Sequence, residues 1–578
     1  MPIHPKAILR SLLWPLATIA SLADLDHRKS DLTVQVQSIG GQPLENATIE
    51  VQMLNHAFRF GCSTQHRFID PNSNQYNPTV VANLQRYFNS MTYGNFMKWT
   101  YFEARTDAEN VELVTLPQSY HAFNSSDPLR VRGHVTIWGS AYQVPDRVKN
   151  SSEPDYIHQQ ILDHVHAYHA TFKNAGVDNF DLHNEPLHER ELLIEKIVAS
   201  GEVADEAAII ADWFKKAKEA DPNAILFIND YNILNANWVA NHGAAKEYKA
   251  LIDAIRDAGG PIDGIGVQAH MSHITTRENL EARLAILAEP MAPTDNYPQG
   301  LPSLPIEITE YDINESDGSP SDQDQATQTR DLLTAAFENP SVNGVTIWGM
   351  NDSNHWRGNA IMFNDSDPEN WVVKPSGQEW IDLVMAHWWT DENGVSNNQG
   401  EYQTPVFKGK HRIRVTYNGV TQEYIQDITK AATVEASFAT NHQEASTYPE
   451  WKNFIPWNLP SDSDKTADPD GDKRSNLAEY LLGSDPNSLD NLPSDYVTAN
   501  APGDLSYHYS HRAESENLNV EIEYADDLLR WLSYPDEVLP PPSADPEPIL
   551  TTTSNGVSTF KVQMIPEGFY RLKIAEVP

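Results

Sequence analysis

The stretch Asn179-Phe180-Asp181-Leu182-His183-Asn184-Glu185-Pro186 indicates the fold of this chain. Its apolar residues, Phe180 and Leu182, recur at a period of two, which is typical of a short buried strand. The closing proline cannot donate to a strand ladder, so Asn184 and Glu185 should lie where a strand ends and a loop begins. In an α/β barrel, the carboxyl ends of the strands form the catalytic face. Taken alone, the stretch fits a strand end with a solvated glutamate equally well.

A second stretch of the same kind, Pro305-Ile306-Glu307-Ile308-Thr309-Glu310-Tyr311-Asp312-Ile313, favours a catalytic interpretation. This stretch also predicts a strand whose end carries acidic residues. Two glutamates at strand ends are the minimal equipment of a retaining glycoside hydrolase. Such an enzyme needs one carboxyl that is neutral and one that is charged at the working pH. Repulsion between the two carboxyls can produce this difference.

The composition limits the classes of partner. The 578 residues suggest two to four domains, and 41 Lys and Arg against 81 Asp and Glu give a formal charge of −40. This charge argues against nucleic acid and anionic membranes, because both are bound through basic surfaces. It favours a neutral or cationic substrate. The single cysteine, Cys62, excludes an intrachain disulfide and is expected to be a packed thiol.

The N-terminus has the pattern of an export signal over residues 1–23. Lys6 and Arg10 precede a short apolar core at residues 11–20, and small residues follow at 21–23. The apolar core is too short to span a bilayer, and a frayed N-terminal helix is the alternative. We therefore expect a secreted or periplasmic protein whose mature form begins near Asp24.

Residues 57–390 alternate short apolar runs with helical patterns, which predicts an α/β fold, a (β/α)8 barrel. No G-x-G-x-x-G or phosphate loop occurs there, which argues against a nucleotide-binding fold. Expected helices cover residues 155–175, 204–220, 244–258, 277–288, 322–338 and 376–389. A short strand near Met91 completes eight strands with those expected at 57–61, 129–134, 179–183, 224–229, 264–269, 305–309 and 342–348.

The segments on either side of the barrel region have the residue patterns of β-strands. Residues 24–56 alternate in hydrophobicity on either side of Gly40-Gly41, which predicts an N-terminal hairpin module that packs on the barrel. Residues 391–440 predict a β appendage and 491–578 a small β-sandwich. The aromatic- and proline-rich residues 441–460 predict a linker.

Residues 461–490 contain a candidate metal site. Oxygen-bearing side chains occupy positions one, three, five, nine and twelve of a loop, which is the ligand spacing of a calcium loop. The glycine is at position four and not six, so the loop departs from an EF-hand, and a solvated acidic linker is the alternative. The run resembles the Asp-rich calcium repeats of secreted multidomain proteins. The expected ligands of a structural Ca2+ are Asp468, Asp470, Asp472, Asn476 and Glu479.

The barrel region resembles glycoside hydrolase family 10, the family of endo-β-1,4-xylanases. Six motifs occur in the order of the family, over about residues 57–390. They are Asn95, Lys98 and Trp99 after the second strand, Arg132 to Trp138 after the third, Asp181 to Pro186 around the acid/base, Gly264 to His270 in the sixth strand, Ile308 to Asp312 around the nucleophile, and Trp348 to Trp356 after the eighth.

The resemblance implies a retaining mechanism that needs no cofactor. Glu185 would protonate the leaving oxygen and later activate water, and Glu310 would attack the anomeric carbon. His270 would hold Glu310 by a hydrogen bond, and Asn184 would contact the sugar 2-hydroxyl. For each binding residue, ordinary packing is the alternative, and Trp99 is the weakest candidate. The expected substrate-binding residues are Asn95, Lys98, His134, Trp138, Asn184, Gln268, His270, Trp348 and Trp356.

Two glycines depart from the family pattern. Gly94 stands where the family usually has Glu, and Gly139 stands where it usually has His. Both positions normally touch sugars on the non-reducing side of the cleaved bond. Loss of two side chains predicts an open cavity there, which would suit a substituted or differently linked chain.

The sequence therefore predicts a secreted, monomeric endo-glycosidase that acts on xylan or a xylan-like polysaccharide. A non-catalytic carbohydrate-binding protein on a decayed barrel is the alternative of a different class, and the presence of Glu185, Glu310, His270 and Asn184 counts against it. A third possibility is a surface adhesin in which the calcium module acts and the barrel is passive.

Overall fold

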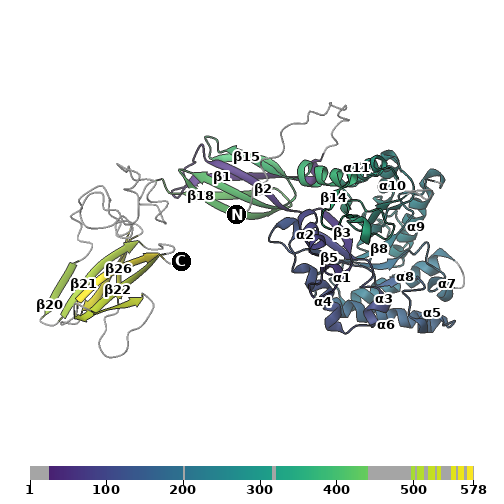
Figure 1. The fold of residues 1–578 in the computed structure, drawn as a ribbon, viewed down its shortest axis with the longest axis horizontal. Helices are drawn as coiled ribbons and strands as arrows, with labels where there is room; N and C mark the ends of the chain where they lie inside the picture. Colours follow the sequence, from purple (N-terminus) through teal and green to yellow (C-terminus); the bar gives the residue numbers. More distant parts are fainter. Residues whose placement is uncertain are drawn as a thin grey trace.

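The computed structural model describes residues 25–198, 202–237, 239–314 and 320–440, together with the backbones of strands between Tyr496 and Glu576 (Figure 1). The predicted export signal at 1–23, the linker at 441–460 and the calcium-type loop at 461–490 lie outside the described residues.

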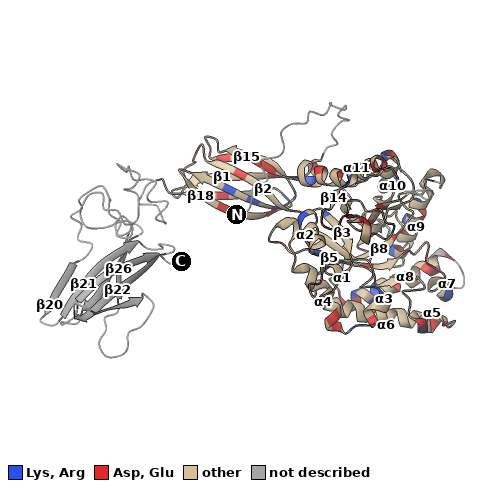
Figure 2. Cartoon of the chain, in the orientation of Figure 1, with Lys and Arg blue, Asp and Glu red and all other residues tan. Residues whose placement is uncertain are grey.

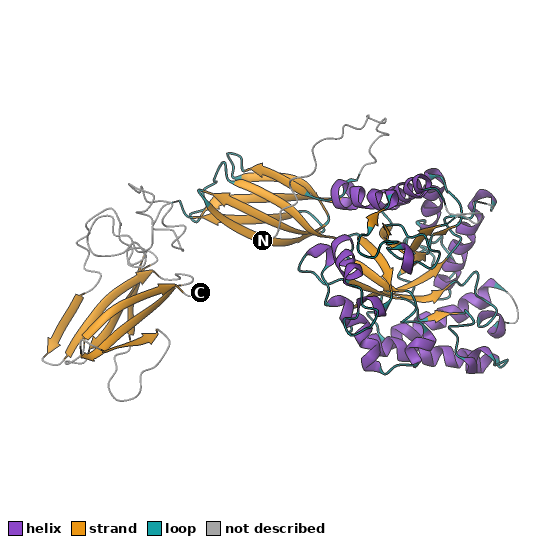
Figure 3. Cartoon of the chain, in the orientation of Figure 1, coloured by secondary structure: helices purple, strands orange, loops and turns teal. Residues whose placement is uncertain are grey.

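Eight parallel strands close into a barrel, which confirms the predicted fold class (Figures 1 and 3). Each strand pairs with the next along the chain, and the last pairs with the first through Gly344 opposite Arg59, so the ring has no free edge. The short strands β6 (Ile137–Trp138) and β10 (His270–Met271) pair with wall strands. The wall consists of β3 (Arg59–Thr64), β4 (Ser90–Tyr93), β5 (Arg130–Gly133), β7 (Val177–Asn184), β8 (Leu226–Asp230), β9 (Gly264–Val267), β11 (Ile306–Ile313) and β12 (Val342–Ile347).

Helices surround the ring of strands (Figure 3). The sequence analysis missed α2 and α4, although both carry start signals. Asn77 caps α2 and Pro78 is its first residue, and Thr106 and Glu109 form a capping box at α4. The major helices are α2 (Pro78–Tyr87), α4 (Asp107–Gln118), α6 (Pro154–Phe172), α8 (Val203–Ala220), α9 (Gly243–Asp257), α10 (Arg277–Leu287), α11 (Asp322–Glu338) and α12 (Pro375–Asp382).

Short elements connect these helices and strands. The α-helical turns are α1 (His66–Ile69), α3 (Trp99–Glu103), α5 (Asp146–Lys149) and α7 (Ile194–Ile197). The 3-10 turns are η1 (Asp26–Arg28), η2 (Ala122–Asn124), η3 (Ala240–His242) and η4 (Asp352–Asn354), η5 (Leu383–His387) is a π turn, and β13 (Phe363–Asn364) pairs with β14 (Val372–Val373).

The strands on either side of the barrel in sequence form two further sheets around their own apolar core. One sheet has the order β16-β1-β19 and the other β15-β2-β17-β18. Alternate side chains of β1 and β2, such as Val34 and Val51, are buried together with Ile413 of β17. The strands are β1 (Lys29–Ser38), β2 (Thr48–His56), β15 (Asp391–Val395), β16 (Glu401–Phe407), β17 (Gly409–Tyr417), β18 (Val420–Ile428) and β19 (Ala432–Phe438).

The predicted hairpin over residues 24–56 is wrong. Gly41, with a φ of 78°, does turn the chain, but β1 then pairs with β16 and β19 while β2 pairs with β15 and β17. The alternating pattern specified two half-buried strands correctly. It could not specify their partners, because those strands lie after the barrel in the sequence.

This two-sheet body is anchored to the amino-terminal end of the barrel. Arg28 donates from Nε to the carbonyl of Phe337 at 2.7 Å and from Nη2 to the carbonyls of Asn339 and Val342 at 2.6 Å each. Trp388 stacks on Phe337 with ring centroids 4.0 Å apart. The end of α11 is therefore contacted by Arg28, which precedes the barrel in the sequence, and by Trp388, near the end of the barrel region.

The backbones of the C-terminal strands form two antiparallel sheets. One sheet has the order β20-β21-β25-β24 and the other β23-β22-β26. They comprise β20 (Tyr496–Ala501), β21 (Asp504–Arg512), β22 (Leu518–Asp527), β23 (Arg530–Pro535), β24 (Pro548–Ser554), β25 (Val557–Met564) and β26 (Phe569–Glu576).

Acidic side chains are spread over the outer helices and the strands of the two-sheet body in Figure 2, in keeping with the net negative charge. In the described part of the chain, no helix combines the length and apolarity that a bilayer crossing requires.

Candidate active site

A cleft of about 540 Å3 opens at the carboxyl ends of the barrel strands. Both predicted glutamates and all nine predicted substrate-binding residues line it. They come together because parallel strands place their carboxyl ends at one rim of a barrel. Trp99, the weakest candidate, is outside the cleft: it is buried in the core, where its indole stacks on His164 at 4.3 Å.

Glu185 follows β7 directly and is almost fully buried. Its φ of 60° is a left-handed conformation that costs a non-glycine residue of order 1 kcal/mol, and its N–H donates to the carbonyl of Asn229 at 2.7 Å. Trp138 Nε1 donates to Oε2 at 2.7 Å, and Gln268 Nε2 donates to Oε1 at 2.9 Å. Burial, with the nearby charges of Asp230 and Glu310, raises the pKa of Glu185 to about 7.

Glu310 lies within β11, where every residue is buried. Asn229 Nδ2 donates to its Oε1 at 2.9 Å, and His270 Nε2 lies 3.2 Å from Oε2. Burial alone would raise the pKa of Glu310, but the charge of His134, 3.9 Å away, and the His270 contact together lower the pKa below its ordinary value. The cleft therefore holds one carboxyl that favours its proton and one that favours its charge.

His270 is held between two carboxylates of β11. Besides its contact with Glu310, its Nδ1 lies 3.0 Å from Asp312 Oδ2, an ionic contact. Burial lowers the pKa of His270, but the two carboxylates outweigh it and raise the pKa to about 9. Asp312 is itself fully buried and also accepts from Trp356 Nε1 at 2.6 Å and from Arg357 Nη1 at 3.0 Å.

Three amides connect the two carboxyls. Asn229 Nδ2 donates to Asn184 Oδ1 at 2.8 Å as well as to Glu310, and Asn184 Nδ2 donates to Glu185 Oε1 at 3.2 Å. Gln268 Nε2 reaches Asn184 Oδ1 at 3.1 Å. These bonds fix the orientation of each amide, so Asn184 and Gln268 present defined groups to a ligand.

Lys98 is one of the cationic residues that line the cleft. Its Nζ donates to Asn95 Oδ1 at 3.1 Å and lies 4.3 Å from the ring centroid of Trp138. Burial lowers the pKa of Lys98 to about 8, although Glu310 and Glu185 act in the opposite direction.

Two aromatic residues and a histidine complete the rim. His134 Nδ1 lies 2.9 Å from Asp181 Oδ2, and its ring meets Trp348 edge-on with centroids 5.3 Å apart. Trp356 is 60% exposed, which leaves most of its ring available to a sugar.

The space directly beside Gly94 and Gly139 is filled, where an open cavity was expected, although Gly94 lines the 540 Å3 cleft. A Cβ on Gly94 would lie 2.6 Å from Nε2 of Gln65, and a Cβ on Gly139 would lie 2.1 Å from the carbonyl oxygen of Glu189. The space that the missing side chains leave is occupied by a glutamine from the β3–α1 connection and by the backbone that follows Glu185.

The sequence analysis missed several cleft residues. Asn229 and Asp230 end β8 in the same way that Asn184 and Glu185 end β7, and this strand-end pattern was visible in the sequence. Asp230 accepts from His188 Nδ1 at 2.6 Å and from the Leu187 N–H at 2.8 Å, so it orders the loop after Glu185. Asn229 and Asp230 lie behind the lining, and the missed residues that line the cleft itself are Gln65, Tyr142, Glu189, Tyr231, Asn232, Ser272 and Arg357.

No group of His, Cys, Asp or Glu suited to a metal ion occurs among the described residues. The five predicted calcium ligands between Asp468 and Glu479 lie outside them.

Comparison with known proteins gives concordant matches. A model of "Glycosyl hydrolase family 10" matches residues 51–372. The anti-sigma-I factor RsgI6 of Acetivibrio thermocellus is 28% identical over 398 residues, which are 68% of this chain and 45% of that protein. Endo-1,4-beta-xylanase 3 of Hypocrea jecorina is 26% identical over 373 residues, 64% of this chain and 95% of that enzyme.

Endo-1,4-beta-xylanase 1 of Arabidopsis thaliana is 23% identical over 411 residues, 70% of this chain and 38% of that protein. The chain thus spans less than half the length of two of these three relatives. The crystal structure of native xylanase 10B from Thermotoga maritima aligns with 57% of this chain and 96% of its own at 22% identity, with a TM-score of 0.45.

Proposed function

Because the chain belongs to glycosyl hydrolase family 10, we propose that it is a retaining endo-glycosidase that hydrolyses xylan or a xylan-like polysaccharide. The observation that carries the proposal is the opposite tuning of two carboxyls in one cleft: the pKa of Glu185 is raised to about 7 and that of Glu310 is lowered. Carboxyls whose environments push their pKa values apart are suited to divided acid and nucleophile roles.

In the first step, Glu310 attacks the anomeric carbon while Glu185 protonates the departing glycosidic oxygen. His270 and Asn229 hold Glu310 by contacts of 3.2 and 2.9 Å, so the nucleophile is oriented before substrate arrives. Trp138 and Gln268 hold both oxygens of Glu185 in the same way.

In the second step, Glu185 activates the water that releases the sugar from Glu310. Esterification removes the negative charge of Glu310, which is one of the charges that raise the pKa of Glu185. The pKa of Glu185 therefore falls once the ester forms, and the residue changes from an acid to a base.

The rest of the cleft supports a polysaccharide substrate. Lys98 and the ordered amides of Asn184 and Gln268 offer donors and acceptors to sugar hydroxyls. The exposed ring of Trp356 and the rim ring of Trp348 offer apolar faces.

We further propose that the chain is exported, that it acts as a monomer, and that Asp468, Asp470, Asp472, Asn476 and Glu479 bind a structural Ca2+. The export and calcium proposals are supported by the sequence pattern: an N-terminal apolar core after Lys6 and Arg10, and oxygen ligands at calcium-loop spacing.

The test is release of reducing sugar from a panel of xylans, mannans and mixed-linkage glucans, with the anomeric form of the first product followed by NMR. We expect activity on xylans with a β-configured product. Glu310→Gln should abolish turnover but retain binding of xylo-oligosaccharides. Glu310→Ala should regain turnover with azide and give an α-product.

Glu185→Ala should retain activity only on substrates with good leaving groups. Oligosaccharide binding without hydrolysis by the unmodified protein would favour the non-catalytic binding protein. Near-normal polysaccharide hydrolysis by either glutamate variant would refute the catalytic assignment.

A further inference from the structure

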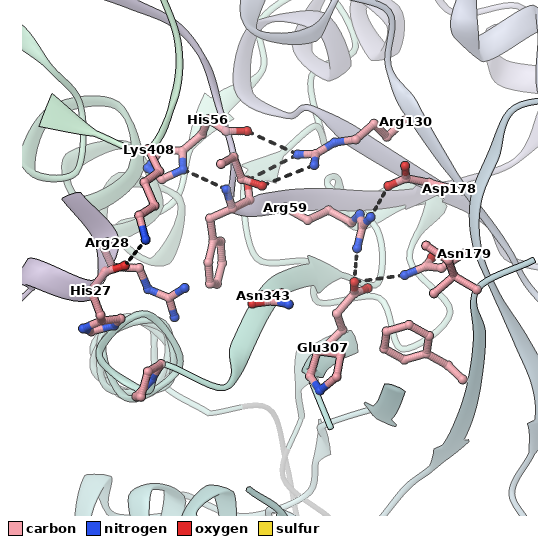
Figure 4. Close-up of a pocket in the computed structure, with 16 residues that line it drawn as sticks. His27, Arg28, His56, Arg59, Arg130, Asp178, Asn179, Glu307, Asn343 and Lys408 are labelled. Carbon is pink, nitrogen blue, oxygen red and sulfur yellow. Dashed lines mark hydrogen bonds and ion pairs between the residues drawn. The ribbon is translucent and has the colours of Figure 1, made fainter. Parts of the chain in front are cut away.

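A second cavity, of about 470 Å3, lies at the opposite end of the barrel, where the strands begin (Figure 4). The starts of β3, β5, β7, β8, β11 and β12 form its barrel wall. The rest includes His27, Arg28, His56 and Lys408, which lie at the ends of strands of the two-sheet body or next to them. No residue of the proposed active site lines this cavity.

Cationic side chains gather around the cavity, although the chain as a whole is strongly acidic. Arg28, Arg59, Arg130 and Lys408 line it, against the carboxylates of Asp178 and Glu307 only. In Figure 4, Arg28 and Lys408 lie on one side and Arg59 and Arg130 on the other.

Both carboxylates are already neutralised. Arg59 forms ion pairs with Asp178 and Glu307, and Glu307 also accepts from Arg132 Nη1 at 2.6 Å and from Asn179 Nδ2 at 2.9 Å. The two carboxylates of the cavity are therefore already paired with Arg59, Arg132 and Asn179.

Among the described residues, the other three cations hydrogen-bond only to neutral carbonyls, and Arg28 also lies over the rings of Phe58 and Phe337. Arg28 donates to carbonyls at the end of α11, and Arg130 donates at 3.3–3.5 Å to the carbonyls of residues 56, 57, 58 and 89. Lys408 Nζ donates to the carbonyl of His27 at 2.9 Å. None of the three has a carboxylate at ion-pair distance within that part of the chain. Burial lowers the pKa of Arg28 and of Arg130 to about 10, so both stay charged at neutral pH.

Asn343 also lines the cavity and is an exposed residue there, so its side-chain amide is open to a ligand. An amide both donates and accepts hydrogen bonds, which suits the hydroxyl groups of a ligand. Apolar side chains, including Phe58, Phe227 and Ile225, form much of the remaining wall. The cavity volume of about 470 Å3 lies within the range of small-molecule sites, roughly 300–1,000 Å3.

We propose that this cavity binds a small hydroxylated carboxylate of the sugar-acid class, with its carboxylate among Arg28, Arg130 and Lys408 and its hydroxyls toward Asn343. The ligand would join the barrel to the two-sheet body, since Arg130 belongs to the barrel wall and Lys408 precedes β17. This proposal does not depend on the proposed function.

The experiment measures thermal unfolding and calorimetric binding of the full chain at constant ionic strength, with glucuronate, glucose and sulfate as probes. Glucuronate at a hundredfold excess over its Kd should raise the Tm by about 5 °C. Glucose lacks the charge and sulfate lacks the donors, so each should raise the Tm much less. An equal shift with sulfate and glucuronate would overturn the sugar-acid class, and no glucuronate shift would overturn the site.

Variants of lining residues test whether glucuronate binds in this cavity. Lys408→Gln should weaken glucuronate binding by at least about tenfold, because hydrogen bonds to charged groups are the stronger ones. Asn343→Asp, at an exposed lining residue, should weaken it by added repulsion without disturbing the core.

Lys246→Gln, at an exposed lysine in the first turn of α9 and outside the cavity lining, is the matched control and should bind as the unmodified chain does. Glucuronate binding that both Lys408→Gln and Asn343→Asp leave unchanged would refute the proposal. Polysaccharide hydrolysis should remain at the unmodified level in all three variants, so its loss would bear on the proposed function separately.

Discussion

The close approach of Gly139 to Glu189 makes Gly139→Ala a sharp test of how the acid Glu185 is positioned. The new Cβ would lie 2.1 Å from the Glu189 carbonyl oxygen, whereas the closest ordinary C···O contacts are about 3.3 Å. The backbone at Glu189 must therefore move by roughly 1 Å. That backbone is tied to the acid, because the N–H groups of His188 and Glu189 donate to the carbonyl of Glu185 at 3.1 and 2.8 Å.

The expected cost has two parts. Overpacking against backbone costs about 1–3 kcal/mol of unfolding free energy. A displacement of about 1 Å in a catalytic group costs about a hundredfold in rate. Gly94→Ala is the matched control: its Cβ would lie 2.6 Å from the terminal Nε2 of Gln65, a side chain that can rotate away. Its cost should be within about 0.5 kcal/mol.

The assay is kcat/KM on xylan and on an aryl xyloside with a good leaving group, alongside thermal unfolding. The loss in Gly139→Ala should be large on xylan and much smaller on the aryl xyloside, because only xylan needs a proton from Glu185. If Gly139→Ala keeps kcat/KM on xylan within twofold of the unmodified enzyme, the turn after Glu185 yields freely and the positioning argument fails.

Three further predictions concern protons and calcium. Glu185 must be protonated to act as an acid, and its pKa is about 7, so kcat/KM should fall as pH rises above about 7. Asp230→Asn removes a charge that raises this pKa and should move the pH profile to lower pH. The pKa of His270 is about 9 in the folded chain, so its stabilising contribution is complete below about 6.5 and disappears as pH rises through 9; Asp312→Asn should flatten that dependence in urea unfolding at pH 6.5–9. Chelation should raise protease sensitivity near residues 461–490 while xylan hydrolysis persists, and unchanged proteolysis in excess chelator would indicate a plain acidic linker.

The arrangement of the proposed catalytic pair was open to prediction because it depends on local rules. Phe180 and Leu182 mark a buried strand and Pro186 ends it, so Glu185 must lie at a strand end. Once the strand count indicates a barrel, Glu310 must share that rim. Asn229 could have been found by the same reasoning.

The contents of the space beside Gly94 and Gly139 were not open to prediction in this way. A missing side chain indicates space only if nothing else moves in, and the groups that moved in are Gln65 and the backbone of Glu189. Neither is adjacent to the glycines in sequence. The partners of β1 and β2 were not open to prediction either, since period-two alternation specifies which face of a strand is buried and not which strand pairs with it.

The strands of the two-sheet body lie on both sides of the barrel in the sequence, so the ribosome makes the first of them long before the last. Ser396 Oγ donates to the carbonyl of Leu44, 352 residues earlier, so the first strands must wait for their partners to be translated. At 5–20 residues per second, that wait lasts roughly 20–70 s. Throughout it, residues 29–56 are alternating apolar segments with unpaired edges, which readily pair with other chains. The yield of folded protein should therefore depend on whether a chaperone covers this segment while the ribosome completes the barrel.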